Sequence, residues 1–275
     1  MKHMLKTFTV LISTLFILQS CKTNGEITAN DTIPKHETFT IASQKLNEKR
    51  IINVWVPKDY TKSKDSLTVV YMPDGGIQED FPHVANTIEK LITENKIEPV
   101  ILVGIENIKR RKDLTPKTEV EDDKKVAPIV GGSSDFRDFI NDELFPEVEK
   151  RFRTKNYKGI IGESLAGLFI TETFLESPQM FDVYIAIDPS LWWNNQYSVK
   201  TAKQNLEKLP SKPIKYWFAA SDAGDINRNT VQLENILKDV NLPQLKWFYS
   251  NEAKETHATI YRATEEKALT WGLGK

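Results

Sequence analysis

The fold of this chain is indicated by the segment Gly159-Ile160-Ile161-Gly162-Glu163-Ser164-Leu165-Ala166-Gly167-Leu168. A short apolar run leads into Ser164, and a helical apolar pattern continues beyond Leu168. A serine placed between a strand and a helix is typical of a nucleophile elbow. The elbow turns so sharply that the residues two before and two after the serine must be small, and Gly162 and Ala166 meet that demand. The pattern departs from G-x-S-x-G only at Ala166, and it predicts that Ser164 attacks a carbonyl carbon.

The composition predicts a globular protein with a substantial core. The chain has 275 residues, of which 40% are hydrophobic and 27% charged, and this length suits one large α/β domain. Its net charge of −1 gives no bias toward nucleic acid or anionic surfaces, so no nucleic-acid partner is expected. Because no His/Cys/Asp cluster stands at ligand spacing, neither a metal nor a cofactor is implied.

The N-terminal segment differs from the rest of the chain. Basic residues precede an apolar run at 8–18, which is too short to span a membrane but suits a signal peptide. The only cysteine, Cys21, follows with a leucine three positions before it and a serine directly before it, as in a bacterial lipobox. We expect a lipoprotein signal peptide at 1–20, lipidation of Cys21 and a flexible tether at 21–35. The protein would then be exported, with its membrane contact confined to the lipid anchor, facing the periplasm or the cell surface. An ordinary signal peptide with an incidental cysteine is the alternative.

From residue 36 to residue 275, strand-like and helix-like segments alternate. Besides the elbow strand, apolar runs bounded by turn residues predict strands at 37–42, 50–56, 67–72, 100–105, 183–187, 214–219 and 245–249. Besides the elbow helix, helical periodicity predicts helices near 84–92, 135–152, 199–206, 230–240 and 263–269. Pro146 should kink or split the second of these helices, and 106–133 is expected to be a long loop. This alternation predicts one α/β domain, with a mostly parallel sheet covered by helices on both faces.

A serine nucleophile needs a base, an acid and an oxyanion hole, which such a sheet supplies from loops at the carboxyl ends of its strands. In the order serine, acid, histidine, only His257 follows Ser164. His257 lies in the loop after the last predicted strand, and it is the expected base. His83, at a helix start, is expected to be structural or to lie at the rim of the pocket.

The acid is expected in the loop after the penultimate strand. Asp222 and Asp225 both stand there, and their positions alone do not separate them cleanly. We favour Asp222, the first carboxylate after the strand, because a buried carboxylate there would hold the imidazole tautomer. The oxyanion hole is expected to use two backbone N–H groups, one from Leu165 and one from Gly76 or its neighbour Ile77.

Three further strings accompany the elbow, the glycine turn and the His257 loop. They are Val103-Gly104-Ile105-Glu106-Asn107, Arg111-Lys112-Asp113-Leu114-Thr115-Pro116 and Pro189-Ser190-Leu191-Trp192-Trp193. Together these segments resemble the putative-esterase family of α/β-hydrolases, which includes esterase D, feruloyl and acetyl xylan esterases, mycolyltransferases and enterochelin-type siderophore esterases. The similarity spans nearly all of the mature chain, and the strings look most like the siderophore-esterase branch.

The resemblance implies an α/β-hydrolase fold and assigns roles to several residues. It implies Ser164 as nucleophile, His257 as base and Asp222 as acid, because the segment ending in Asp222 is similar to the family's G-x-x-D pattern. By analogy Arg111 would line the substrate cleft. Asp188 stands where the siderophore branch usually has serine, and we expect it to alter the charge of the pocket.

The same analogy places Trp192 and Trp193 in the cleft, with burial in the core as the alternative. The resemblance implies an exported serine esterase that acts on a small-molecule siderophore ester or, alternatively, on feruloyl or acetyl esters of a glycan. An acyltransferase would use the same triad with a hydroxyl acceptor. A binding lipoprotein without activity would be expected to lack a member of the triad.

Overall fold

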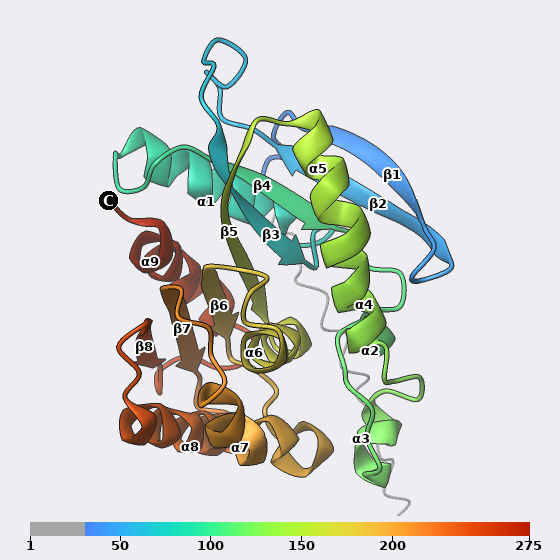
Figure 1. The fold of residues 1–275 in the computed structure, drawn as a ribbon, viewed down its shortest axis with the longest axis vertical. Helices are drawn as coiled ribbons and strands as arrows, with labels where there is room; N and C mark the ends of the chain where they lie inside the picture. Colours follow the sequence, from blue (N-terminus) through green and yellow to red (C-terminus); the bar gives the residue numbers. More distant parts are fainter. Residues whose placement is uncertain (1–30) are drawn as a thin grey trace, which may run out of the picture.

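One eight-stranded sheet carries the fold in the computed structural model, which describes residues 31–275. The strands lie in the order β1-β2-β4-β3-β5-β6-β7-β8 (Figure 1). Strands β1, β2 and β4 pair antiparallel, and every other pairing, from β4 across to β8, is parallel. This confirms the predicted sheet. The strands are β1 Glu37–Ser43, β2 Glu48–Trp55, β3 Leu67–Pro73, β4 Val100–Ile105, β5 Thr154–Glu163, β6 Val183–Ile187, β7 Ile214–Ala220 and β8 Leu245–Asn251.

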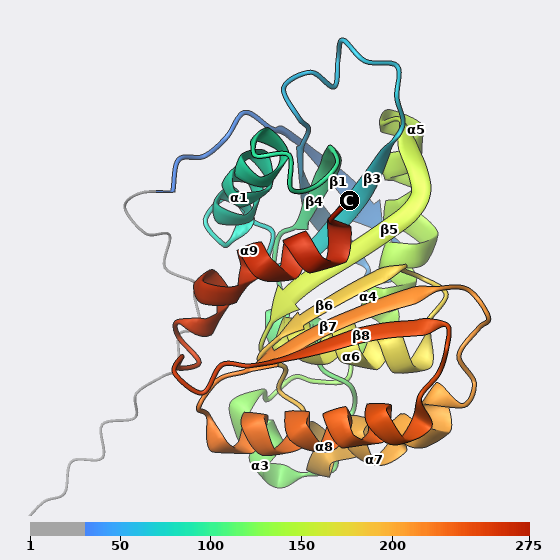
Figure 2. The same ribbon diagram turned by 90° about the vertical axis from the view of Figure 1, so that its left-hand side faces the viewer.

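Helices cover both faces of the sheet, as Figure 2 shows. On one face, α1 (Phe81–Thr93) packs beside α9 (Ile260–Leu273), and α9 contacts β6 and β7. The segment expected to be a long loop contains two short helices, α2 (Arg110–Asp113) and α3 (Glu121–Val126). The helices of the other face are α4 Ser133–Phe139, α5 Phe145–Arg151, α6 Leu165–Glu176, α7 Trp193–Leu206 and α8 Gly224–Val240. Among the helices of residues 31–275, none is both long and apolar enough to cross a membrane.

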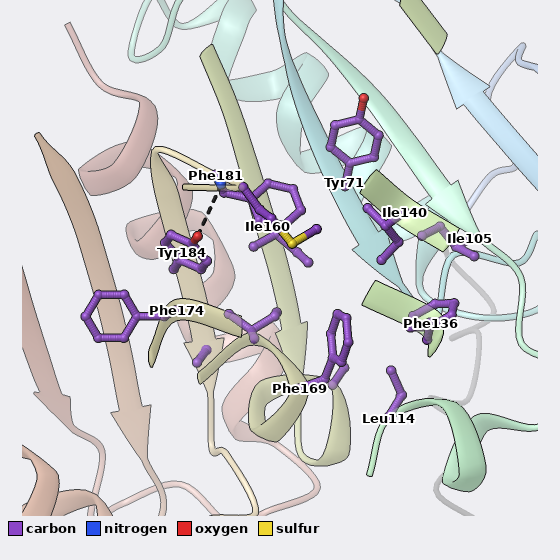
Figure 3. Close-up of a cluster of buried hydrophobic side chains, with 14 of the residues drawn as sticks. Tyr71, Ile105, Leu114, Phe136, Ile140, Ile160, Phe169, Phe174, Phe181 and Tyr184 are labelled. Carbon is purple, nitrogen blue, oxygen red and sulfur yellow. Dashed lines mark hydrogen bonds between the residues drawn. The ribbon is translucent and has the colours of Figure 1, made fainter. Parts of the chain in front are cut away.

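The larger of two apolar cores lies between the sheet and α4 to α8, and Figure 3 shows part of it. Aromatic rings fill much of this core; the ring centroids of Phe174 and Tyr216, for example, are 4.4 Å apart. Helix α6 is buried at every position from Leu165 to Leu175, as expected for a helix that is apolar on nearly all sides. This packing holds the N-terminus of α6, where the elbow lies, in one position.

Pro146 splits its helix as predicted, by means of a π-helical turn. The turn η1, Ile140–Leu144, separates α4 from α5. The N–H of Phe145 donates to the carbonyl of Ile140, five residues back. Because proline has no N–H and its ring crowds the carbonyl four residues before it, the helix widens just ahead of Pro146.

The predicted signal peptide at 1–20, the predicted lipidation of Cys21 and the part of the predicted tether at 21–30 lie outside the described residues. Asp31 and Thr32, near the end of the predicted tether, lie against the domain. The Asp31 carboxylate is 2.8 Å from Arg262 and 3.2 Å from His83, and the side chain of Asn86 donates to the carbonyl of Thr32.

Candidate active site

Ser164 occupies the sharp turn between β5 and α6. Its backbone has φ 60° and ψ −117°, a region that residues with a side chain rarely adopt. The Ser164 N–H donates to the carbonyl of Ile187 in β6 at 3.0 Å, which fixes the turn against the neighbouring strand. A Cβ atom added to Gly162 would lie only 2.7 Å from the Cβ of Ala166. The structure therefore confirms that the elbow needs small residues on both sides, and Ala166 fits.

His257 lies in the loop between β8 and α9 and reaches back to the serine. Its Nε2 atom is 3.1 Å from Oγ of Ser164, and its Nδ1 atom is 2.6 Å from Oδ2 of Asp188. Asp188 is completely buried, and Ser164 is 8% exposed. In this line of hydroxyl, imidazole and carboxylate, the imidazole can take the serine proton while the carboxylate holds the Nδ1–H tautomer.

The prediction that Asp222 is the acid of the triad is wrong. Asp188, which follows β6, binds His257, whereas Asp222 and Asp225 are exposed beyond β7. Strand β7 extends through Ala220, so that Ser221 is the first residue beyond it. Ser221 is fully buried and points toward the site, and the next side chain turns outward, as alternation along an extended chain requires.

Asp188 meets the same two criteria that favour Asp222. It is the first carboxylate after a buried strand, and it lies between serine and histidine in sequence order. Applying these criteria to β6 as well as to β7 would have found it. Ser221, which donates two hydrogen bonds to Asp188, was not singled out.

The predicted oxyanion donors differ in whether their N–H groups already have an acceptor. Leu165 is the first residue of α6, where backbone N–H groups have no acceptor within the helix. The N–H of Gly76 donates instead to Oε2 of Glu79 at 2.7 Å, so this predicted donor is already engaged. The alternative was Ile77, and no acceptor for its N–H is found among residues 31–275. The turn also brings two backbones together, since a Cβ atom on Gly75 would lie 2.3 Å from Cα of Gly104.

Carboxyl groups gather beside the nucleophile. Burial raises the pKa of Glu163 well above its usual value, and the nearby charges of Asp80 and Asp188 add to this effect. Burial and the charge of Asp74 raise the pKa of Asp80 to about 7. The Arg110 guanidinium binds both oxygens of Asp74, at 2.5 and 2.8 Å. The raised pKa values favour the protonated carboxyl groups, and Arg110 pairs with Asp74, so both effects limit the negative charge next to the serine.

The three residues expected in the cleft have different environments. Trp193 is 1% exposed, and its Nε1–H donates to the carbonyl of Pro116 at 3.1 Å, so it takes the core position that was the alternative. Trp192 is partly exposed, with its ring centroid 5.7 Å from that of Trp193. Arg111 is exposed and donates to the carbonyl of Val126. A place in the cleft remains a prediction for Trp192 and Arg111.

A strained turn fixes the segment after the tryptophans. Asn194, Asn195 and Gln196 all have left-handed backbone angles, which asparagine tolerates and glutamine adopts rarely. The N–H of Asn194 donates to Oδ2 of Asp123 at 2.8 Å, and Thr118 donates to the same oxygen at 2.6 Å. The buried Asp123 thus fastens the segment around α3 to the start of α7.

His83 has a structural role, which is one of the two roles expected for it. Its Nε2 atom is 3.0 Å from Oε2 of Glu265, and its Nδ1 atom is 2.6 Å from Nη1 of Arg262. His83 therefore links α1 to α9. In the described part of the chain, no group of three or more His, Cys, Asp or Glu residues could hold a metal ion.

Comparison with known proteins identifies related chains. The family model described as "Putative esterase" matches residues 43–262. The ferri-bacillibactin esterase BesA of Bacillus subtilis is 26% identical over 274 residues, which cover 92% of this chain and 94% of that protein. The siderophore enterobactin esterase of Emericella nidulans is 28% identical over 188 residues, which cover 60% of this chain and 61% of that protein.

Solved structures share the fold. An IroE-like serine hydrolase from Shewanella oneidensis superposes with a TM-score of 0.77 at 24% identity, covering 87% of this chain and 79% of that one. The siderophore hydrolase EstB from Aspergillus nidulans gives a TM-score of 0.75 at 20% identity, covering 88% of this chain and 96% of that one. Both superpositions extend over most of the sheet and its helices.

Proposed function

This chain belongs to the putative esterase family and is a carboxylic-ester hydrolase, and on that premise we propose that it cleaves siderophore esters with a Ser164–His257–Asp188 triad. The observation that carries the triad is the line of contacts from Oγ of Ser164 through the imidazole to the buried Asp188 carboxylate. The substrate class rests on the relatives named as bacillibactin and enterobactin esterases.

The proposed reaction has two halves. His257 Nε2 takes the Oγ proton as Ser164 attacks the ester carbonyl, and Asp188 stays ionised and stabilises the imidazolium. The N–H groups of Leu165 and Ile77 donate to the oxyanion. His257 then protonates the departing alcohol, which leaves an acyl-serine. Water, deprotonated by the same imidazole, attacks this ester and releases the carboxylic acid and the free serine.

Export and membrane anchoring are also proposed. The apolar run at 8–18 and the single Cys21 behind it support a lipoprotein signal. Cells grown with labelled palmitate should yield labelled protein in the membrane fraction. The Cys21→Ala variant should carry no label and move to the soluble fraction. A labelled variant, or an unlabelled wild-type protein, would contradict this proposal.

Hydrolysis of a panel of esters tests the function. The panel contains bacillibactin, enterobactin, triacetylfusarinine C, methyl ferulate and acetylated xylan, with products identified by mass spectrometry. We expect kcat/KM for at least one siderophore to exceed that for the ferulate and acetyl esters by tenfold or more, and Ser164→Ala to be inactive. The reverse preference would make the enzyme a carbohydrate esterase. Acyl transfer to an added alcohol as the main product would make it an acyltransferase.

A further inference from the structure

The Asp188 carboxylate receives three hydrogen bonds, and two of them come from one residue. The Ser221 N–H donates to Oδ1 at 2.7 Å, and the Ser221 hydroxyl donates to Oδ2 at 2.8 Å. His257 Nδ1 supplies the third bond, also to Oδ2. Asp188 and Ser221 are both fully buried, so water does not compete for these contacts. Each oxygen of the carboxylate is therefore fixed by a donor of the same serine.

This two-point contact determines where the carboxylate faces. A carboxylate held at one oxygen can rotate about its last torsion, whereas donors at both oxygens define its plane. The backbone of Asp188 is held by the neighbouring strand, because its N–H donates to the carbonyl of Ala219 in β7 at 3.0 Å. Asp188 has φ 46°, an unfavourable backbone angle that persists only when its surroundings enforce it.

The Ser221 hydroxyl is itself oriented. The N–H of Ala223 donates to Ser221 Oγ at 3.2 Å, which leaves the hydroxyl proton for Asp188. The loop after β7 is also joined to the histidine loop, since the N–H of Asp222 donates to the carbonyl of Glu255 at 2.9 Å. The loop after β7 thus contacts the acid through Ser221 and the loop that carries the base through Asp222.

We propose that Ser221 is a positioning residue of the triad, whose hydroxyl and N–H together aim the Asp188 carboxylate at His257. The proposal rests on the proposed function, because it assumes that Asp188 acts through His257. The acid comes from the end of β6, and the end of β7 supplies the hydroxyl that holds it.

The Ser221→Ala variant separates this role from mere packing. The variant keeps the N–H bond to Oδ1 and loses the hydroxyl bond to Oδ2, together with the longer bond that Ser221 Oγ accepts from the Ala223 N–H. We expect kcat to fall about 10- to 30-fold with KM unchanged, because substrate binding does not involve the acid. The low-field NMR signal of the His257 Nδ1 proton should move upfield, because its short hydrogen bond to Oδ2 lengthens. Ser221→Thr keeps the hydroxyl and should restore both readouts.

Ser133→Ala is the matched control. Ser133 is also a buried serine, 1% exposed, whose hydroxyl donates to a carboxylate, Oε1 of Glu172, at 3.1 Å. This variant should lower the melting temperature about as much as Ser221→Ala, yet leave kcat and the Nδ1 proton signal unchanged.

Two outcomes would overturn the positioning role. One is a Ser221→Ala variant with wild-type kcat and an unshifted Nδ1 signal, and the other is an equal loss of kcat in Ser133→Ala. Failure of the proposed function is distinguishable, because a wild-type enzyme that hydrolyses no ester would still show whether the Nδ1 signal depends on Ser221. If Ser221→Thr does not fold, its melting curve will show this, and the comparison of the two alanine variants decides.

Discussion

His257 Nδ1 lies 2.6 Å from Oδ2 of Asp188, a residue that follows β6, while Asp222 beyond β7 is exposed. The two strands are parallel neighbours, so their carboxyl ends open onto the same edge of the sheet. Either loop could therefore reach a histidine at that edge. The buried position and the direct contact distinguish Asp188.

The Asp188→Asn variant tests this assignment. Asparagine cannot stabilise an imidazolium as a carboxylate does, and its amide group favours the wrong histidine tautomer. We expect kcat to fall by about 10³- to 10⁴-fold, the loss typical of such a change in a serine triad. Asp222→Asn is the control and should stay within twofold of wild type. Steady-state kinetics on a p-nitrophenyl ester measures both, and a larger loss in Asp222→Asn would refute the assignment.

Asp80 gives a prediction for stability against pH. Burial raises its pKa from 3.8 to about 7, whereas in the unfolded chain it ionises near 3.8. Between about pH 4 and pH 7 the folded protein thus holds a proton that the unfolded chain lacks, so stability falls as the pH rises through this window.

Replacing the Asp80 carboxyl should remove this penalty. We expect Asp80→Asn to melt about 5 °C above wild type at pH 8, which corresponds to about 2 kcal/mol for a domain of this size. At pH 4 the two proteins should melt together. Asp59→Asn, at an exposed aspartate, is the control and should show no difference at either pH. A constant difference between Asp80→Asn and wild type at both pH values would argue against titration of Asp80.

The elbow predicts a compensating pair of substitutions. In Gly162→Ala the new methyl group would lie 2.7 Å from the Cβ of Ala166 and 3.2 Å from Cδ1 of Ile170, so the turn must shift. We expect kcat to fall at least tenfold, because a small displacement of the nucleophile disrupts its alignment. Ala166→Gly alone should stay within twofold of wild type.

The double variant Gly162→Ala/Ala166→Gly makes the steric cause testable. It removes the contact between the two Cβ atoms and should recover most of the lost kcat. If the double variant is as slow as Gly162→Ala, the collision across the elbow is not the cause.

The adjacent tryptophans should separate stability from substrate binding. Trp193 is buried and hydrogen-bonded, so Trp193→Ala should lower the free energy of unfolding by about 3–5 kcal/mol. Trp192 is partly exposed, and Trp192→Ala should raise KM several-fold with a much smaller loss of stability. Urea unfolding measures the loss of stability in the two variants, and steady-state kinetics measures the change in KM. A large loss of stability in Trp192→Ala would place it in the core as well.

Most of the fold follows from local pattern. Buried parallel strands form continuous apolar runs, and the run at 100–105 matches β4 to the residue. Short polar helices carry no such signal. Helix α3 contains a single apolar residue, Val126, and it is held by the contact of Asp123 with the start of α7, so its position depends on tertiary structure.

Part of the site could also be predicted from local sequence pattern. Ser164 and His257 could be found because the elbow is local and only one histidine follows it. The identity of the acid depends on how far β7 extends, since one more strand residue buries Ser221 and exposes Asp222. The engagement of the Gly76 N–H by Glu79 likewise depends on a side-chain conformation that spacing does not determine.

Trapping of the acyl-enzyme tests whether Ser164 is the nucleophile. The protein is mixed with a p-nitrophenyl ester, quenched in acid within the burst phase, and analysed by intact-mass and peptide mass spectrometry. If Ser164 is the nucleophile, one acyl group per chain will be found on the peptide that contains Ser164, and Ser164→Ala will form no adduct. An acyl group on another residue, or hydrolysis at the wild-type rate by Ser164→Ala, would contradict this assignment.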